Sequence, residues 1–492
     1  MENYDYDLES IQEARTLARK GKKAQTELAH FTANQIDTII RKMVETAQEN
    51  AVLLAKMAVE ETGFGKVEDK IFKNHHASTE LYQFIKDMKT VGVIKDDPER
   101  KIIEIAEPMG LLMGIIPSTN PTSTVIYKAI ISIKARNGIV ISPHPSALKA
   151  TMKAAQLMND AAVSAGAPDN IVTCISKPSM QATNELMRSE EVALIIATGG
   201  AAMVKAAYSV GKPALGVGPG NVPSYIEKTA DIKQAVADII ASKTFDNGTI
   251  CASEQAVIVE EELESQVVSE FQRQGGYFMT EEETAKVSQK LFVKGHAMNA
   301  RLVGRSPKVI AEAAGISIPD GTKVLLGRQN GVGEGYPLSY EKLTTVLGFY
   351  TVKDWEEACE TSIALLNNGG VGHSFAIHTQ DRELLMKFAE KPVFRILVNT
   401  GSTQGGVGAS TAISPAFTLG CGTWGGSATS DNVTPEHLIN IKRMACGIKP
   451  INNPYAENQY STVQTTQRTN AQSADMESLI KELVSFFKES GE

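Results

Sequence analysis

Cysteine and long apolar runs are scarce in this chain of 492 residues. Its five cysteines are widely spaced and form no Cys-x-x-Cys pair, so neither a disulfide framework nor a zinc cluster is expected, and no metal site is predicted. The longest apolar run, Leu111–Ile116, is far too short to span a bilayer. The first residues are polar and lack the apolar core of a secretory signal, which predicts a cytoplasmic chain that spans no membrane.

An excess of basic residues is also lacking. The chain carries 49 Lys and Arg against 57 Asp and Glu, a net charge of -8. Nucleic-acid binding needs a basic surface that displaces counterions from phosphates, so it is not expected, and a small-molecule substrate is favoured. With 42% hydrophobic residues over this length, the chain should form two or three domains with sizeable cores.

What the sequence does contain is a repeated alternation of short apolar runs with helical patterns. The alternation begins at Gly110 and starts again after Cys251, which is typical of two doubly wound parallel α/β sheets. A helical region is expected before it, within residues 1–90. The strand candidates are GLLMGII, GIVIS, NIVTCIS and VALIIA in the first series, and QAVIV, KVLLG, TVLGFYTV, SFAIH and FRILVNT in the second.

These patterns divide the chain into five parts. The α/β units should be joined by a short return segment to a polar tether rich in Asn, Gln, Ser and Thr, followed by a helix with an apolar stripe and Asp475 as N-cap. The predicted limits are 1–248 for the helical region and first α/β domain, 249–425 for the second, 426–449 for the return segment, 450–474 for the tether and 475–490 for the helix.

Glycine-rich turns follow two strand candidates, where doubly wound sheets bind ligands. Thr198-Gly199-Gly200 could aim helix amides at a phosphate, and a mere packing turn explains it equally well. The segment Gly216–Gly220 predicts either a close approach of the backbone to a ligand or a simple bend.

Two side chains could carry chemistry. Asn120, after the strand ending GII, could donate its amide to a developing oxyanion or simply cap the next helix. Cys251 lies between a glycine-bearing turn and a strand, and position alone leaves core filler and nucleophile both open. No histidine stands near it in sequence, which disfavours a cysteine hydrolase.

Several long motifs together carry a family resemblance. Residues 10 to 446 are similar to the CoA-acylating aldehyde dehydrogenases, above all to the aldehyde dehydrogenase half of bifunctional aldehyde-alcohol dehydrogenases. The resemblance implies a Rossmann-like NAD-binding domain and a catalytic domain, with the iron-dependent alcohol dehydrogenase half missing. The motifs are GIIPSTNPTSTVIYKA, SPHPSA, ATGGAAMVKAAYSVGKPALGVGPGNVP, SKTFDNGTICASEQ, YEKLTTVL, NNGGVGHS and LGCGTWGGSATSDNVTPEHLINIKRMA.

This resemblance implies a mechanism. Cys251 would attack a short-chain aldehyde such as acetaldehyde or propionaldehyde, while Asn120 and the Cys251 backbone N–H hold the oxyanion. Hydride passes to NAD, and coenzyme A takes the acyl group from the resulting thioester. Hydrolytic relatives place a glutamate where this chain has Gly216–Gly220, so thiolysis is favoured. A hydrolytic enzyme and an inactive scaffold remain the alternatives.

Further contacts come from the resemblance alone. His373 would assist the coenzyme A thiol or serve only structure, and His144, where many relatives have lysine, leaves NAD against NADP open. Trp424 and the cysteines other than Cys251 are interpreted as core packing. The predicted cofactor contacts are Ile115, Ile116, Pro117, Ser118, Thr119, Asn120, His144, Gly200, Gly218, Glu341 and Leu419.

The C-terminal helix resembles the encapsulation peptides that direct enzymes into bacterial microcompartments. So short a helix gains order by laying its apolar face on a partner. A shell protein bound through residues 475–490 would place the enzyme in a microcompartment lumen. Docking on a sister subunit and a weak membrane-surface role are the alternatives. The family also implies a homodimer or homotetramer.

Overall fold

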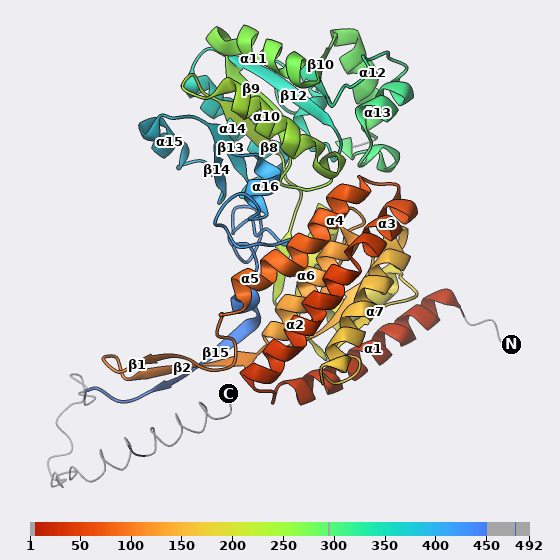
Figure 1. The fold of residues 1–492 in the computed structure, drawn as a ribbon, viewed down its shortest axis with the longest axis vertical. Coiled ribbons are helices and arrows are strands. Elements are labelled where there is room, and N and C mark those ends of the chain that lie inside the picture. Colours follow the sequence, from red (N-terminus) through yellow and green to blue (C-terminus); the bar gives the residue numbers. More distant parts are fainter. Residues whose placement is uncertain (1–4, 294–295, 450–477, 479–492) are drawn as a thin grey trace, which may run out of the picture.

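The computed structural model describes residues 5–293, 296–449 and Ser478 (Figure 1). The tether predicted at 450–474 and, apart from Ser478, the helix predicted at 475–490 lie outside the described residues. Three sheets organise the chain: one of five strands, one of seven and one of three. Within the described part, no helix has both the length and the apolar character needed to cross a membrane.

Helices fill the N-terminal region, as the sequence predicts. Asp5 caps the first helix through its side chain, and Thr32 forms a capping box with Gln35 at the second, which satisfies amides that a helix start leaves free. The elements are α1 (Tyr6–Leu28), α2 (Ala33–Glu49), α3 (Ala51–Thr62), α4 (Val67–His75), a π-helical segment (His76–Glu80) and α5 (Leu81–Ile85).

The five-stranded sheet is parallel, in the order β5-β4-β3-β6-β7. The order reverses between β3 and β6, and such a reversal opens a crevice beyond the carboxyl ends of the strands. Its strands are β3 (Leu111–Ile115), β4 (Gly138–Ser142), β5 (Val172–Cys174), β6 (Val192–Thr198) and β7 (Ala214–Val217), and its connecting helices are α6 (Pro121–Lys134), α7 (Leu148–Ser164), α8 (Met180–Arg188) and α9 (Ala201–Ser209).

The seven-stranded sheet is also parallel, in the order β10-β11-β12-β9-β8-β13-β14. Its strands are β8 (Val222–Ile226), β9 (Glu254–Glu260), β10 (Gly276–Met279), β11 (Val324–Arg328), β12 (Val346–Val352), β13 (Phe375–His378) and β14 (Ile396–Val398). Its helices are α10 (Ile232–Thr244), α11 (Glu261–Gln274), α12 (Glu281–Leu291), α13 (Pro307–Ala314), α14 (Trp355–Gly369), α15 (Arg382–Phe388) and α16 (Ser402–Gly406).

The chain changes sheets earlier than the sequence patterns indicate. Strand β8 already pairs with β9 and β13, so the crossover lies between β7 and β8, ahead of the limit predicted at residue 248. All nine strand candidates are strands in the structure, whereas β7, β8 and β10 were not predicted.

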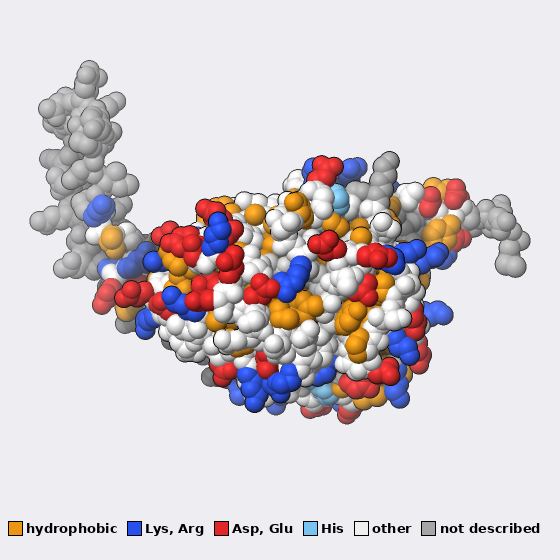
Figure 2. All heavy atoms as spheres, turned by 90° about the horizontal axis from the view of Figure 1, so that it is seen from above, with side chains coloured by type: hydrophobic (Ala, Val, Ile, Leu, Met, Phe, Trp, Pro, Cys, Tyr) orange, Lys and Arg blue, Asp and Glu red, His pale blue; other side chains and the backbone are white. Residues whose placement is uncertain are grey.

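A third, antiparallel sheet joins β1 (Gly92–Asp97), β2 (Ile102–Pro108) and β15 (Ile439–Ala445), and it projects from the body as an arm (Figure 1). Acidic and basic side chains are interspersed over the described atoms on the face in Figure 2, and no basic stripe that would follow a nucleic-acid backbone is seen there. The surface therefore agrees with the net negative charge.

Candidate active site

Cys251 lies in the turn that leads into β9. The chain reaches it through a tight 3-10 turn, Phe245–Gly248, in which Asp246, Asn247 and Gly248 all have positive φ. A Cβ atom on Gly220 would lie 1.9 Å from the Cys251 carbonyl oxygen. The loop after β7 therefore packs directly on the Cys251 backbone, and only glycine fits at position 220.

This contact yields a prediction for Gly220→Ala. The added methyl must push the Cys251 backbone away, and a displacement of about 1 Å in a reacting group lowers turnover roughly 100-fold. Steady-state assays of NADH formation, compared with Gly447→Ala, check it. A Cβ on Gly447, in the loop after β15, meets no heavy atom within 4 Å, so that variant controls for the loss of a loop glycine away from the site. Equal losses in both variants would contradict the account.

The Cys251 residue is only partly buried, yet the surroundings of its sulfur atom disfavour the negatively charged thiolate. Burial, together with the nearby carboxylate of Glu341, raises the pKa of the thiol to about 12, and the Arg395 guanidinium opposes that rise. Burial also raises the pKa of Glu341 to about 7, and Glu341 accepts a 3.0 Å hydrogen bond from the Gly220 backbone N–H. At neutral pH the free chain holds a protonated thiol.

Asn120 occupies the N-cap position of α6, but its side chain makes no capping hydrogen bond. Its Nδ2 donates to the Thr249 carbonyl at 3.1 Å and to the Thr119 hydroxyl at 3.2 Å, and its Oδ1 accepts from Lys73 Nζ at 2.6 Å. The capping interpretation is therefore wrong. The amide N–H groups face the segment that carries Cys251.

His373 is fully buried beside this loop. Its Nδ1 is 3.0 Å from the Ser374 hydroxyl, and its Cδ2 is 3.4 Å from where a Cβ on Gly220 would lie. Burial lowers the pKa of His373 to about 3, so the imidazole is neutral. Its Nε2 has no hydrogen-bond partner among the described residues, which leaves one polar atom free to meet a ligand.

Arg395, directly before β14, was not found from the sequence. Its buried guanidinium donates to the carbonyl oxygens of His373 (3.0 Å) and Gly420 (2.7 Å) and to Asn432 Oδ1 (2.7 Å). In the described part of the chain it forms no ion pair with a carboxylate. An arginine in a strand pattern gives no signal that its charge acts on a thiol far away in sequence.

Removing this charge should alter the titration of Cys251. Arg395→Met takes away the cation that lowers the pKa of the thiol, so alkylation of Cys251 by iodoacetamide should need a higher pH. Peptide-resolved mass spectrometry across a pH series measures the shift, and Arg395→Lys is the matched control that keeps a charge. An unchanged profile in a folded Arg395→Met protein would refute an electrostatic role.

Gly216 stands in the segment where the family resemblance places the glutamate of hydrolytic relatives, and packing leaves no room for a side chain there. A Cβ on Gly216 would lie 2.7 Å from Val204 Cγ1 and 2.8 Å from Tyr208 Cε2. The Tyr208 hydroxyl accepts hydrogen bonds from the backbone N–H groups of Gly216 (2.8 Å) and Ala428 (3.0 Å), which hold the ring in place. The sequence shows the missing carboxylate, and the structure adds that α9 fills the space.

The predicted cofactor residues differ in how open their surroundings are. Gly200 begins α9 after β6, and Cβ atoms on Gly200 and on Gly218 would meet no heavy atom within 4 Å. His144 is exposed at the end of β4, and its Nδ1 accepts from the Ser146 N–H at 3.1 Å. Ile115 and Ile116 are buried, Pro117, Ser118 and Thr119 are partly buried, and Leu419 packs in the core.

The core-packing interpretation is wrong for Trp424, which is 60% exposed and stacks on Phe394 with ring centroids 4.9 Å apart. Gly422 and Gly426, on either side of it, have positive φ. The same interpretation holds for Cys421, which is buried in a hydrophobic core, and for Cys174 and Cys359, which are partly exposed but pack against hydrophobic cores. Cys446 is partly exposed.

Comparison with known proteins decides the family. The model of the aldehyde dehydrogenase family matches residues 4–286. The chain belongs to the aldehyde dehydrogenase family. The predicted aldehyde dehydrogenase-like α/β fold is thus confirmed, and a crystal structure of an acetylating aldehyde dehydrogenase from Geobacillus thermoglucosidasius superposes with a TM-score of 0.90 at 53% identity, covering 91% of this chain and 99% of that one.

Curated relatives narrow the comparison within the aldehyde dehydrogenases. A bifunctional aldehyde-alcohol dehydrogenase of Escherichia coli is 47% identical over 89% of this chain and 50% of its own length, so the chain spans about half of that relative. The acetylating succinate-semialdehyde dehydrogenase of Clostridium kluyveri is 40% identical over 87% of this chain and 94% of its own.

Two more distant solved structures bear on ligands and setting. Propionaldehyde dehydrogenase of Rhodopseudomonas palustris, with bound propionyl-CoA, has a TM-score of 0.80 at 25% identity, covering 88% of this chain and 94% of that one. A propionaldehyde dehydrogenase from the fucose utilisation bacterial microcompartment of Clostridium phytofermentans has a TM-score of 0.79 at 27% identity, covering 87% and 96%.

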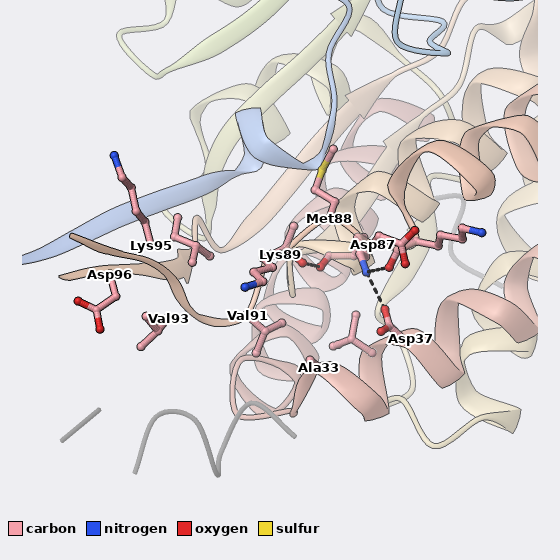
Figure 3. Close-up of a pocket in the computed structure, with 14 residues that line it drawn as sticks. Ala33, Asp37, Asp87, Met88, Lys89, Val91, Val93, Lys95 and Asp96 are labelled. Atoms are coloured by element: carbon pink, nitrogen blue, oxygen red, sulfur yellow. Dashed lines mark hydrogen bonds and ion pairs between the residues drawn. The ribbon is translucent and has the colours of Figure 1, made fainter. Parts of the chain in front are cut away.

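A separate pocket of about 500 Å³ lies between α2 and the start of the arm (Figure 3). Lys134 crosses it to Asp37 at 2.6 Å and to the Lys86 carbonyl at 3.2 Å. It shares no lining residue with the cysteine site. The described residues hold no group of His, Cys, Asp and Glu side chains placed to bind a metal ion.

Proposed function

We propose that this aldehyde dehydrogenase converts a short-chain aldehyde, coenzyme A and NAD to acyl-CoA and NADH through a thioester on Cys251. The observation that carries the proposal is a cysteine, Cys251, two residues after the carbonyl that accepts from the Asn120 amide, together with a position 216 where a side chain would collide with α9. Because position 216 carries no carboxylate to activate water, a thiol acceptor is favoured as the more acidic nucleophile.

The first step is attack of Cys251 sulfur on the aldehyde carbon. The thiol loses its proton to the solvent, and Arg395 is the cation that favours the resulting thiolate. The oxygen of the adduct gains negative charge, and we assign its stabilisation to Asn120 Nδ2 and the Cys251 backbone N–H. Such donors act most strongly where water is excluded. The oxyanion then re-forms a carbonyl as hydride departs.

NAD is the cofactor assigned to the turns after β6 and β7. The N-terminus of α9 offers amides to a phosphate, and the open space over Gly200 and Gly218 lets a ligand approach the backbone. Bound NAD would supply the hydride acceptor. Glu341, held by the Gly220 N–H, would receive a ribose hydroxyl, and His144 leaves the choice between NAD and NADP as a property to be measured.

The second step is transfer of the acyl group to the coenzyme A thiol. Neutral His373, with its free Nε2, can accept the hydrogen bond of that S–H group. Sulfur of coenzyme A then attacks the thioester carbon, its proton passes to the solvent, and the bond from the acyl carbon to sulfur of Cys251 breaks so that Cys251 leaves as thiolate. The propionyl-CoA bound to the Rhodopseudomonas palustris relative supports coenzyme A as the acyl acceptor.

Trapping the thioester tests the proposal. Protein mixed with propionaldehyde and NAD, without coenzyme A, should gain the mass of one propionyl group on the Cys251 peptide, and later addition of coenzyme A should remove it as propionyl-CoA. Absence of acylation in protein that forms NADH would overturn the proposal.

The encapsulation role predicted for residues 475–490 and the homo-oligomeric state belong to the same proposal. The microcompartment origin of the Clostridium phytofermentans relative supports a lumenal setting. Removal of residues 450–492 should leave NADH formation intact and abolish co-purification with shells. Loss of activity on truncation would refute a pure addressing role.

A further inference from the structure

Two buried lysines share one buried carboxylate beneath the cysteine loop. Lys70 and Lys73 on α4 are 2% and 1% exposed, and Asp246 is fully buried. Asp246 Oδ2 pairs with both ammonium groups, with Lys70 at 2.8 Å. Buried ions are destabilising unless they are well paired, and one carboxylate does not balance two cations. Stability alone therefore does not explain why two buried lysines share the Asp246 carboxylate.

The second lysine, Lys73, has three acceptors for its three protons. Beside Asp246, its Nζ donates to Asn120 Oδ1 at 2.6 Å and to the Thr249 hydroxyl oxygen at 3.2 Å. The Thr249 hydroxyl donates in turn to Asp246 Oδ2 at 2.7 Å, so its lone pairs remain for Lys73. Burial lowers the pKa of Lys73 to about 8, against the charge of Asp246, and the ammonium form has one proton for each of these three acceptors.

These bonds fix which end of the Asn120 amide faces the cysteine loop. An ammonium group has no acceptor, so it must meet Oδ1 and leave Nδ2 pointing to the Thr249 carbonyl, two residues before Cys251. Without this cation the amide could flip and present its oxygen, which repels an oxyanion. An oxyanion accepts a stronger hydrogen bond than Thr249 or Thr119 does and can displace them.

We propose that Lys73 is a positioning residue that orients the Asn120 amide with its N–H groups toward the reacting oxygen. The inference rests on the role of Asn120 in the proposed function. Lys70 is the matched control for Lys73, because it lies three residues earlier on α4 and binds the same carboxylate. Its second bond goes to the Thr119 backbone carbonyl at 2.9 Å rather than to the amide.

A double-mutant comparison tests the proposal in the single-turnover burst of NADH with propionaldehyde and NAD, before any acyl acceptor acts. Lys73→Met should slow the burst about 10- to 100-fold, a fraction of what loss of an oxyanion donor costs. In an Asn120→Ala background the same change should slow it less than about 3-fold, since the group it orients is gone. Lys70→Met should have equal effects in both backgrounds.

Two measurements distinguish the role of Lys73 in orienting the Asn120 amide from a general role in stabilising the fold. Lys73→Gln, which can donate to Asn120 Oδ1 without a charge, should retain more burst rate than Lys73→Met, and it carries the comparison if Lys73→Met does not fold. The thermal midpoints of Lys70→Met and Lys73→Met should be lowered by similar amounts. Equal factors for Lys73→Met in both Asn120 backgrounds would overturn the proposal. Free-acid formation without coenzyme A would refute the proposed function instead and leave this comparison readable.

Discussion

Cys251→Ala is expected to abolish NADH formation from aldehyde, lowering turnover about 10⁴-fold or more, because removal of a covalent nucleophile removes the whole pathway. The site offers no substitute at this position. Cys421, the other buried thiol near it, donates to the Leu419 carbonyl at 3.5 Å and has a pKa that burial raises to about 11. Steady-state absorbance at saturating propionaldehyde, NAD and coenzyme A measures the loss.

A second cysteine variant controls for thiol loss in general. Cys359 is partly exposed and packs against the core of the seven-stranded sheet, away from the loop. Cys359→Ala should keep the activity of the unaltered chain. Substantial NADH formation by folded Cys251→Ala protein would show that the oxidation proceeds without this sulfur and would end the thioester account.

Asn120→Ala should lower turnover about 10²- to 10³-fold, the effect of removing one preorganised oxyanion donor. Little change in the thermal midpoint is expected from the start of α6, because the Asn120 side chain makes no capping bond there. Rapid-mixing measurement of the NADH burst places the loss in the oxidation step rather than in thioester transfer.

The variant Asn120→Asp distinguishes a role of Asn120 as hydrogen-bond donor from a role as helix cap. Aspartate is a good N-cap and nearly isosteric with asparagine, but it replaces the N–H donors with a negative oxygen. A donor role predicts that Asn120→Asp is at least as inactive as Asn120→Ala. Retention of near-full activity by Asn120→Asp would mean that the amide stabilises no oxyanion.

The sequence predicts most of the two parallel sheets because their strands are short, apolar and bounded by turns. The antiparallel arm escapes prediction for a physical reason. Strand β1 is charged and exposed, and β2 pairs with β15 more than 300 residues away, for example Arg443 with Glu104. No local pattern reports such a pairing. Trp424 was missed because two flanking glycines, rather than hydrophobicity, decide its exposure.

The candidate active site could also be predicted only in part. Cys251, Asn120, Glu341 and His373 stand in motifs that a family resemblance marks, and the structure brings them around one loop. The residues that hold these side chains in place do not lie in such motifs. Lys73, for example, pairs with Asp246, which is 173 residues away in the sequence. A buried lysine on a helix looks like a solvated one in sequence, since only the tertiary partner shows that it is paired.

The central claim is that coenzyme A, and not water, takes the acyl group from Cys251, since position 216 leaves no room for a base. The direct measurement is steady-state turnover with propionaldehyde and NAD, with and without coenzyme A, with the product identified by mass spectrometry. The account predicts one burst of NADH without coenzyme A, then sustained turnover to propionyl-CoA when it is added. Equal turnover to propionate in its absence would contradict the account.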